Sequence, residues 1–293
     1  MTVAFITGAN SGIGRSTAVG LAAKGWDVYG TMRRLESGDK LAAMAAERGV
    51  TVHPVQCDVT DTDSVGAAVA EVIGAAGGID VLVNNAGIGG NGVMEETPLE
   101  LYQEVMDVNV YGVIRCVQAV LPHMRERGSG CIVNIGSVTG VIAAMAQSAY
   151  VASKWAIEGL TEGLAQEVAP HGIRVALIEP GIVKTAIMAK NTDAPNTTGA
   201  YDAHNRRLFA FYAAGLRTPG QPEEVADVVF RAATEEHPTL RHTCGWGGPE
   251  LTGRKPGVAD EDWVAMGAID DDLAYAARFN ELFGLDISSG FEG

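Results

Sequence analysis

Long hydrophobic runs are missing from this sequence of 293 residues. No stretch approaches the roughly 18 consecutive apolar residues that a membrane-spanning helix needs. The opening TVAFITGAN has neither the basic start nor the sustained apolar core of a signal peptide. We therefore expect a chain that does not enter a membrane and that carries no secretion signal.

Cysteine is scarce as well, with four residues in the chain. Cys57, Cys116, Cys131 and Cys244 are scattered, and none belongs to a C-x-x-C pair. Isolated cysteines of this kind are typical of reduced, buried thiols in a cytosolic protein. We predict a cytoplasmic location and no metal site.

Basic residues are too few for a nucleic-acid-binding protein. Lysine and arginine number 21 against 36 aspartates and glutamates, which gives a formal net charge of −15. This charge repels nucleic acid and anionic membrane surfaces, and short basic pairs such as Arg33 with Arg34 do not reverse it. Repeats of about 20 to 50 residues are also missing, which excludes solenoids and propellers.

The sequence does contain a regular alternation of short β-branched runs and longer alanine-rich segments. The short runs are Val3–Ile6, Asp27–Thr31, Thr51–Gln56, Val81–Asn84, Cys131–Ile135 and Arg174–Glu179. The helix-like segments are Arg15–Lys24, Ser37–Arg48, Ser64–Ala76, Leu99–Arg127 and Ala149–Ala169. Continuous apolar strands separated by helices predict an α/β fold with a single doubly wound parallel sheet and helices on both faces.

The domain organisation follows from two regions that break the alternation. We expect one catalytic domain over residues 1–250, which includes an insertion at 184–220 with weak helical patches. Long connections inside a compact domain are usually lids or binding loops. Residues 251–293 form an acidic extension that we expect to pack on the same domain. Within it, DDDLAYAARFNELFG predicts a helix that ends at Gly284.

The segment TGANSGIG places Gly8, Gly12 and Gly14 between the first predicted strand and the first helix. Backbone amides at a helix N-terminus attract a pyrophosphate, and glycines let a ligand approach the chain closely. A plain tight turn is the alternative, since the chain contains 37 glycines. The position between a strand and a helix favours a dinucleotide site.

Several polar residues follow later strands, and each has an ordinary structural explanation when taken alone. Asn84 to Gly87 could form a capped turn, Asp58 could begin a helix, and Ser137 could do the same. Tyr150 and Lys154 could form a surface pair on one helix face. Taken together, in this order, they favour a functional site at the carboxyl edge of the sheet.

The motifs TGANSGIG, NNAG, YVASK and EPGIVKT, together with Asn109 and Ser137, resemble the short-chain dehydrogenase/reductase family in order and spacing. The resemblance covers about residues 2–245. Within the family, VYGTMRR and QPEEVADVVFRAATEEHPTLRH are most similar to the 17-beta-hydroxysteroid and retinol dehydrogenase branch. The resemblance implies a Rossmann-type sheet of about seven strands and an enzyme that interconverts alcohols and carbonyl compounds.

The resemblance also implies four catalytic residues. Tyr150 would exchange a proton with the substrate oxygen, and Ser137 would form a hydrogen bond to the same oxygen. Lys154 would bind the nicotinamide ribose, and its charge would lower the pKa of the phenol towards the working pH. Asn109 would hold a water that links Lys154 to solvent.

Cofactor contacts are implied for residues from several loops. Asn85 to Gly87 would line the adenosine ribose, Asp58 would reach the adenine amine, and the segment from Pro180 to Thr185 would orient the nicotinamide carboxamide. The complete expected set is Gly8, Asn10, Ser11, Gly12, Ile13, Gly14, Arg33, Asp58, Val59, Asn85, Ala86, Gly87, Tyr150, Lys154, Pro180, Gly181, Ile182, Val183 and Thr185.

The stretch DVYGTMRRLE bears on the choice of cofactor. Met32 stands where an acid would bind the ribose 2′-hydroxyl of NAD, and Arg33 follows it. A guanidinium suits the 2′-phosphate of NADP. The alternative is that the arginines are simply exposed in a loop, and the glycine motif has Asn10 and Ser11 where some NADP-preferring relatives carry a basic residue. We predict NADP(H), with NAD(H) possible.

The substrate region is rich in apolar side chains: Val138, Ile142, Met145, Met188, Phe209, Phe211 and Tyr212. They indicate a lipophilic ketone or secondary alcohol, or else they pack a lid onto the core. His204 could anchor a substrate or be a solvated loop histidine.

Two further functions compete with an NADP(H)-dependent reductase. One is an NAD-dependent secondary-alcohol dehydrogenase that works in the oxidative direction. The other is a non-catalytic dinucleotide-sensing protein, which the presence of both Tyr150 and Lys154 disfavours. The resemblance further implies a homodimer or homotetramer built on the helices near 99–127 and 149–169.

Overall fold

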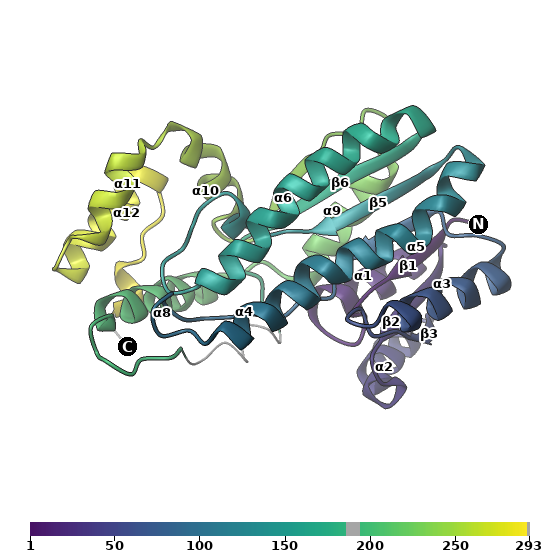
Figure 1. The fold of residues 1–293 in the computed structure, drawn as a ribbon, viewed down its shortest axis with the longest axis horizontal. Coiled ribbons are helices and arrows are strands. Elements are labelled where there is room, and N and C mark those ends of the chain that lie inside the picture. Colours follow the sequence, from purple (N-terminus) through teal and green to yellow (C-terminus); the bar gives the residue numbers. More distant parts are fainter. Residues whose placement is uncertain (186–193, 292–293) are drawn as a thin grey trace.

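The structure is a computed structural model that describes residues 1–185 and 194–291. Its centre is a sheet of seven parallel strands in the order β3-β2-β1-β4-β5-β6-β7 (Figure 1). The strands are β1 Val3–Ile6, β2 Asp27–Met32, β3 His53–Gln56, β4 Val81–Asn84, β5 Gly130–Ile135, β6 Ile173–Pro180 and β7 Arg241–Cys244. The predicted doubly wound parallel sheet is confirmed.

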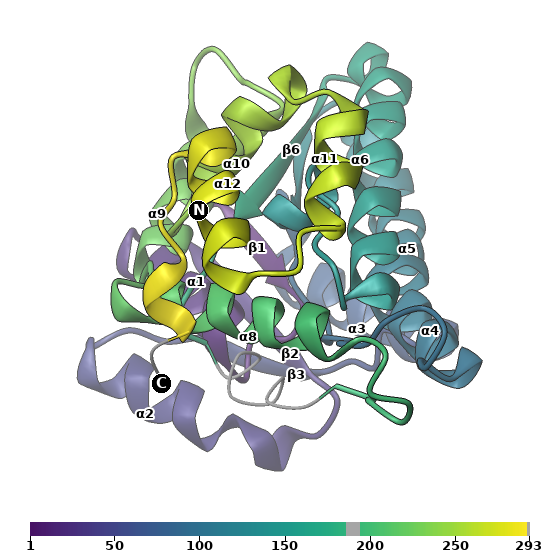
Figure 2. The same cartoon turned by 90° about the vertical axis from the view of Figure 1, so that its left-hand side faces the viewer.

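Helices cover both faces of the sheet, and Figure 2 shows the sheet between α1 and α9 on one side and α5 and α6 on the other. One face carries α1 Gly12–Ala23, α2 Asp39–Glu47 and α9 Pro222–Thr234. The other face carries α3 Thr62–Ala76, α5 Gly112–Arg127 and α6 Ser148–Val168.

The four residues of strand β1 contribute to the hydrophobic cores on both faces of the sheet. Successive side chains of a strand point to opposite faces. Ala4 and Ile6 accordingly join the core beneath α1 and α9, whereas Val3 and Phe5 join the core beneath α3 and α5. All four are buried, as expected for a strand that is covered on both sides.

The six predicted strands are all present, but the seventh was not predicted as a segment. Strand β7 reads RHTC and, like β3 with HPVQ, lacks the apolar run that marks the central strands. The expected long helix 99–127 is divided into α4 Leu99–Met106, a π-helical turn Asp107–Tyr111 and α5. A π turn leaves no periodic signature in the sequence, and it often marks a functional site.

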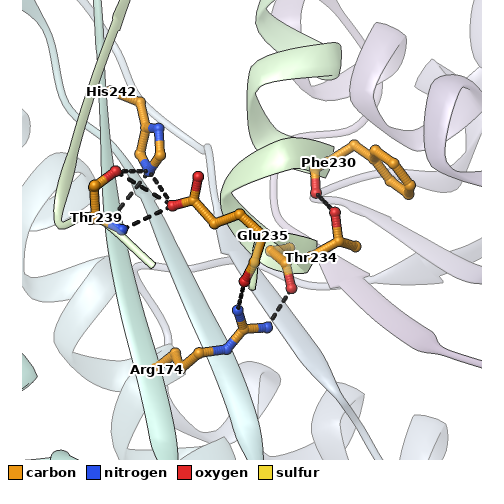
Figure 3. A network of polar contacts seen from close by, with 7 residues as sticks. Arg174, Phe230, Thr234, Glu235, Thr239 and His242 are labelled. Atoms are coloured by element: carbon orange, nitrogen blue, oxygen red, sulfur yellow. Dashed lines mark hydrogen bonds and ion pairs between the residues drawn. The ribbon is translucent and has the colours of Figure 1, made fainter. Parts of the chain in front are cut away.

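A polar network fixes β7 at the edge of the sheet (Figure 3). Arg174 on β6 donates to the backbone carbonyls of Ala233 and Glu235, where α9 ends. The Glu235 carboxylate accepts from the backbone N–H of Thr239 at 2.8 Å and lies 3.4 Å from Nε2 of His242. The turn between α9 and β7 is therefore held by side chains rather than by apolar packing.

The insertion and the C-terminal extension meet at one end of the sheet (Figures 1 and 2). The insertion contains α8, and the extension contains α10, α11 and α12. Their bounds are α8 Asp202–Arg217, α10 Gly248–Arg254, α11 Asp260–Gly267 and α12 Asp272–Phe283. Short 3-10 turns lie at Leu35–Gly38, Val138–Gly140, Ala169–His171, Lys255–Gly257 and Ser288–Phe291.

Helix α12 confirms the predicted C-terminal helix. The Asp271 side chain accepts from the backbone N–H of Ala274, and Gly284 ends the helix with φ +70°. Arg207 of α8 is buried and pairs with Asp272 at 2.9 Å, while its guanidinium lies 4.5 Å from the centre of the Tyr275 ring. This ion pair joins the insertion to the extension.

None of the helices in the described ranges is long and apolar enough to cross a membrane. The four cysteines are free and buried, as the sequence predicted. The cytoplasmic location stays a prediction.

Gly181 provides a test of how closely the strand ends are packed. A Cβ at this position would lie 2.0 Å from the carbonyl oxygen of Trp246 and 2.8 Å from the backbone nitrogen of Gly248. Gly181→Ala should therefore lower the free energy of unfolding by at least ~3 kcal/mol, because backbone atoms must move to accept the methyl group. Urea unfolding followed by circular dichroism would measure the loss.

Gly66 is the matched control, since it lies in α3 with no heavy atom within 4 Å of the added Cβ. Gly66→Ala should raise the free energy of unfolding by roughly 0.5–1 kcal/mol through helix propensity. Equal effects at the two positions would contradict the tight packing assigned to Gly181.

Candidate active site

A cavity of about 450 Å³ opens at the carboxyl ends of the strands. Its walls come from the loops that follow β1 to β6, which parallel strands bring to one edge. Of the catalytic and cofactor-binding residues predicted from the sequence, Gly14 and Asn109 are not on the wall. Those that are on it are Gly8, Asn10, Ser11, Gly12, Ile13, Arg33, Asp58, Val59, Asn85, Ala86, Gly87, Ser137, Tyr150, Lys154, Pro180, Gly181, Ile182, Val183 and Thr185.

The glycine loop at the start of α1 has the geometry of a cradle. Gly8 and Gly12 have φ of +68° and +51°, where a side chain would be strained. Gly14 lies behind the loop, and a Cβ there would come within 2.5 Å of the carbonyl oxygen of Gly8. These glycines fit a pyrophosphate that lies against backbone amides at a helix N-terminus.

Thr7 and Asn85 tie this loop to the end of β4. The hydroxyl of Thr7 accepts from the backbone N–H groups of Asn85 and Ala86, both at 2.9 Å. In return, the Asn85 amide donates to the carbonyl oxygens of Thr7 and Gly8 at 2.8 and 3.3 Å. Asn85 thus shapes the loop as well as lining the cavity. Thr7 was not among the residues predicted from the sequence, because a lone threonine after a strand carries no signal of this role.

Ser137, Tyr150 and Lys154 meet on the cavity wall. The hydroxyls of Ser137 and Tyr150 form a hydrogen bond. Lys154 Nζ donates to the carbonyl oxygen of Ile135 at 2.8 Å and lies 5.5 Å from the centre of the Tyr150 ring. Thr139 donates to Ser137 Oγ through both its N–H and its hydroxyl, which fixes the serine rotamer.

The pKa values in this cluster differ in one respect from the sequence-based expectation. Burial raises the pKa of Tyr150 to about 12, and the Ser137 hydrogen bond opposes the rise. Burial lowers the pKa of Lys154 to about 8, and the negative charge of Glu158 opposes the fall. The expected lowering of the phenol pKa is not found, because burial disfavours the phenolate more strongly than the Ser137 hydrogen bond favours it.

Asn109 lies in the π turn, is buried and is not part of the cavity wall. Its Oδ1 accepts from the N–H of Ile88 at 2.9 Å, and its Nδ2 donates to the Ile88 carbonyl and to Ser153 Oγ, both at 3.0 Å. The side chain joins the loop after β4 to helix α6. The water-holding role implied by the family stays a prediction.

Positive charge gathers at the end of β2. Arg33, Arg34 and Ser37 line the cavity, while Asn10 of the glycine loop donates to Ser37 Oγ at 3.3 Å. Met32 is buried and offers no carboxylate. The role of Ser37 was missed, since the sequence gives no indication that its turn folds back onto the glycine loop.

Asp58 is not the helix cap that the sequence allowed as an alternative. Asp61 caps α3, whereas Asp58 Oδ1 accepts from the N–H and hydroxyl of Thr60 at 3.0 and 2.7 Å. Asp58 therefore lies on the cavity wall without a role in starting the helix.

A smaller apolar cavity continues the first one towards the C-terminal helices. Val138, Thr139 and Phe211 line both cavities. The predicted apolar residues Ile142 and Met145 line the second, together with Leu208, Leu251, Trp263, Tyr275, Phe279 and Ile287. Phe211 also packs edge-on against Trp246, so the insertion both lines a cavity and packs on the core.

The remaining predicted substrate residues are divided among several environments. Tyr212 is buried and bonds to Gln147 and Asn91 beside the cavity. Phe209 packs against Tyr212. His204 lies on α8 rather than in a loop, is half-buried and edge-on to Tyr201, and is on neither cavity wall. Met188 falls outside the described residues.

Comparisons with known proteins agree with this geometry. Residues 2–196 match the short chain dehydrogenase family. The human 17-beta-hydroxysteroid dehydrogenase type 1 is 41% identical over 254 residues, which cover 82% of this chain and 76% of the relative. The 3-ketodihydrosphingosine reductase of Bacteroides thetaiotaomicron is 40% identical over 83% of this chain and 87% of its own. The solved structure of a short-chain dehydrogenase from Streptomyces avermitilis superposes with a TM-score of 0.79 at 36% identity, and covers 92% of this chain and 98% of the other.

The bond between Thr7 and the end of β4 can be tested by removing one hydroxyl. Thr7→Val keeps the shape of the side chain but leaves the N–H groups of Asn85 and Ala86 without their acceptor. An orphaned buried donor costs about 1–3 kcal/mol and these two donors are part-buried, so we expect a loss of ~1–3 kcal/mol in the free energy of unfolding.

Thr17 is the matched control, since it is fully buried in α1 and its hydroxyl has no partner in the part of the chain that the structure describes. Thr17→Val should be neutral or stabilising when both variants are unfolded in urea. A Thr7→Val protein as stable as Thr17→Val would refute the bridging role.

Proposed function

Because this chain belongs to the short-chain dehydrogenase family and is an oxidoreductase that interconverts alcohols and carbonyl compounds with a nicotinamide dinucleotide, we propose that it is an NADP(H)-dependent reductase of lipophilic ketones. The observation that carries the proposal is the cluster of Ser137, Tyr150 and Lys154 on the wall of a cavity that also contains the glycine loop. A candidate proton donor and a glycine loop suited to a dinucleotide therefore line the same cavity.

The raised pKa of Tyr150 favours the reductive direction. A phenol with a pKa of about 12 keeps its proton at neutral pH and can donate it to a carbonyl oxygen. Ser137 can donate a second hydrogen bond to the same oxygen, where negative charge develops during reduction. Lys154 keeps most of its positive charge below its pKa of about 8, and this charge supports the loss of the Tyr150 proton.

When bound, the nicotinamide supplies the hydride. The residues Pro180 to Val183 and Thr185 line the cavity next to the cluster and are suited to hold the nicotinamide end. Thr185 also packs against the glycine loop, since its Cβ would lie 3.3 Å from a Cβ placed on Gly12. The two ends of the cofactor site are thus held together by protein contacts.

The preference for NADP(H) rests on the end of β2. Arg33 and Arg34 on the cavity wall could pair with a 2′-phosphate, and the hydroxyl of Ser37 could donate to it. Met32 occupies the place of the acid that would bind the free ribose diol of NAD.

A lipophilic substrate is supported by the apolar cavity beside Tyr150. Ligand pockets are mostly apolar with a few polar anchors. Here Phe211, Phe279 and Ile142 supply apolar surface, and Tyr212 could supply a polar anchor near the catalytic cluster. The names of two relatives, a 17-beta-hydroxysteroid dehydrogenase and a 3-ketodihydrosphingosine reductase, point to lipophilic alcohols and ketones. Residues 251–293 contribute part of this cavity, which supports their assignment to the same domain.

A second copy of the chain is a further expected partner. Tyr111, Trp155 and Leu160 are exposed on the helical layer formed by α5, α6 and the π turn between α4 and α5. Large apolar side chains at one surface favour burial against another subunit. We propose a homodimer or homotetramer that uses this layer.

The cofactor assignment predicts a selective effect of Arg33→Ala. Removing a charged partner of the 2′-phosphate should raise the Kd for NADPH about 10- to 100-fold, since hydrogen bonds to charged groups contribute ~1.5–3 kcal/mol. The Kd for NADH should not change. A fluorescence titration with each dinucleotide measures both values, and Arg48→Ala, an exposed arginine away from the cavity, is the control. Equal losses for NADPH and NADH would overturn the 2′-phosphate assignment.

The catalytic assignment predicts that Tyr150→Phe lowers kcat by about 10²- to 10⁴-fold, because the variant lacks the proton that is transferred. NADPH binding should be retained, since the ring and the pocket remain. Steady-state reduction of a ketone, with Tyr29→Phe on β2 as the control, measures the effect. A Tyr150→Phe enzyme with most of its turnover would show that another group supplies the proton.

A further inference from the structure

Two carboxyl groups lie buried behind Lys154, and none of the steps described so far uses them. Glu158 on α6 is 8% exposed and Glu179 near the end of β6 is 2% exposed. The two side chains are in hydrogen-bond contact with each other. Each also has one buried oxygen, Oε1, with no donor in the described part of the chain.

These observations call for a proton between the two groups. Two ionised carboxylates in contact repel each other strongly, and an ionised carboxylate has no hydrogen to donate. A single proton lets one group donate to the other and leaves one negative charge for the pair. Arg241 on β7 matches that charge, since its Nε donates to Glu158 Oε2 at 3.0 Å.

The charged surroundings of the pair are limited. Lys154 and Glu162 flank Glu158 on α6, and Arg241 faces the pair from β7, whereas the Cys244 thiol of β7 lies in the core on the opposite face of the sheet. Glu162 accepts from the second arm of Arg241 at 2.8 Å and is mostly exposed. Arg241 therefore divides its charge between a buried carboxyl pair and a surface carboxylate.

The pair is close enough to influence the active site. Glu158 lies one helical turn after Lys154, and its charge acts on the Lys154 ammonium. Gly140 follows Ser137 in the loop after β5 and packs directly on Glu158. A Cβ on Gly140 would lie 2.9 Å from Glu158 Cγ and 3.0 Å from the Lys154 carbonyl oxygen. The pair thus supports both Lys154 and the serine loop.

We propose that Glu158 and Glu179 share one proton and act as positioning residues for Lys154, so that the protonation state of the pair sets the positive potential beside the Tyr150 hydroxyl. The catalytic part of this inference rests on the proposed role of Tyr150. Loss of the shared proton adds a negative charge behind Lys154 and makes the Tyr150 phenolate harder to form.

The pH range of this effect follows from Glu179. Burial, followed by the charge of Glu158, raises the pKa of Glu179 from 4.5 to about 7. Between these values the folded protein binds more protons than the unfolded chain, so its stability falls as the pH rises. The contribution of Glu179 to the free energy of unfolding is complete below about pH 4.5 and is lost as the pH passes about 7.

The first experiment measures stability, which does not depend on catalysis. Urea unfolding of the full chain between pH 4.5 and 7.5 is compared for the wild type, Glu179→Gln and Glu158→Gln, with Glu162→Gln as the control that removes the other carboxylate partner of Arg241. We expect the fall in stability to disappear in both buried variants and to persist in Glu162→Gln. An unchanged pH dependence in either buried variant would overturn the shared proton, and the second variant serves if the first does not fold.

The second experiment measures the pH profile of kcat/KM for alcohol oxidation, whose rising limb reports the essential base of the free enzyme. Glu179→Gln removes the group that would gain the second negative charge. We therefore expect the rising limb of the kcat/KM profile to move to lower pH by about one unit, which is the effect of one unit charge at short range. Glu162→Gln should leave the limb in place. A limb that does not move in Glu179→Gln, with the stability result as expected, would refute the positioning role. A failure of the proposed function can be distinguished from a failure of the positioning role, because in the first case Tyr150→Phe would retain its turnover.

Discussion

Thr7 and Asn85 join the ends of strands β1 and β4 at the point where the sheet order changes direction. Chain connections on the two sides of such a point run to opposite faces, which leaves a crevice above the strand ends. The mutual hydrogen bonds of Thr7 and Asn85 define the floor of this crevice and hold the glycine loop against it. The residues after β5 and β6 reach the same place because every strand of the sheet is parallel. The glycine loop and the cluster of Ser137, Tyr150 and Lys154 therefore lie at one place because of a single arrangement of strands.

The chemistry depends on a balance between burial and charge. Lys154 is buried and Tyr150 is half-buried, and desolvation shifts both pKa values against ionisation. A buried phenol that keeps its proton is a suitable acid for reducing a carbonyl group. A buried ammonium needs a nearby negative charge to stay protonated, and Glu158 supplies part of it. In the proposed arrangement, the charge of the Glu158–Glu179 pair acts on Lys154 from the side away from Tyr150.

Much of the fold could be predicted from the sequence, because apolar runs mark the central strands β1, β4, β5 and β6 and the glycine motif marks the first turn. Strand β7 could not, since RHTC carries no apolar pattern and is held by polar contacts from β6 and α9. The π turn around Asn109 was likewise hidden within a continuous helical pattern. In both cases, contacts between distant segments decide the local structure.

The candidate site, like the fold, could be predicted from the sequence only in part. Motif residues such as Gly8, Ser137 and Tyr150 lie on one cavity wall as predicted, and their individual roles stay predictions. Ser37 and Thr7 were missed because only the folded chain brings them to the glycine loop. The pKa of Tyr150 was expected to fall, since spacing along a helix reveals a charged neighbour but not the extent of burial.

The most direct test of the central claim is a single-turnover reaction with NADPH that carries deuterium at the hydride position of the nicotinamide. The protein is mixed with this cofactor and a panel of lipophilic ketones, and the products are analysed by mass spectrometry. We expect deuterium on the former carbonyl carbon of the alcohol product, and no product with Tyr150→Phe on the same timescale. Failure of the wild-type protein to reduce any ketone, with bound NADPH verified by fluorescence, would contradict the account.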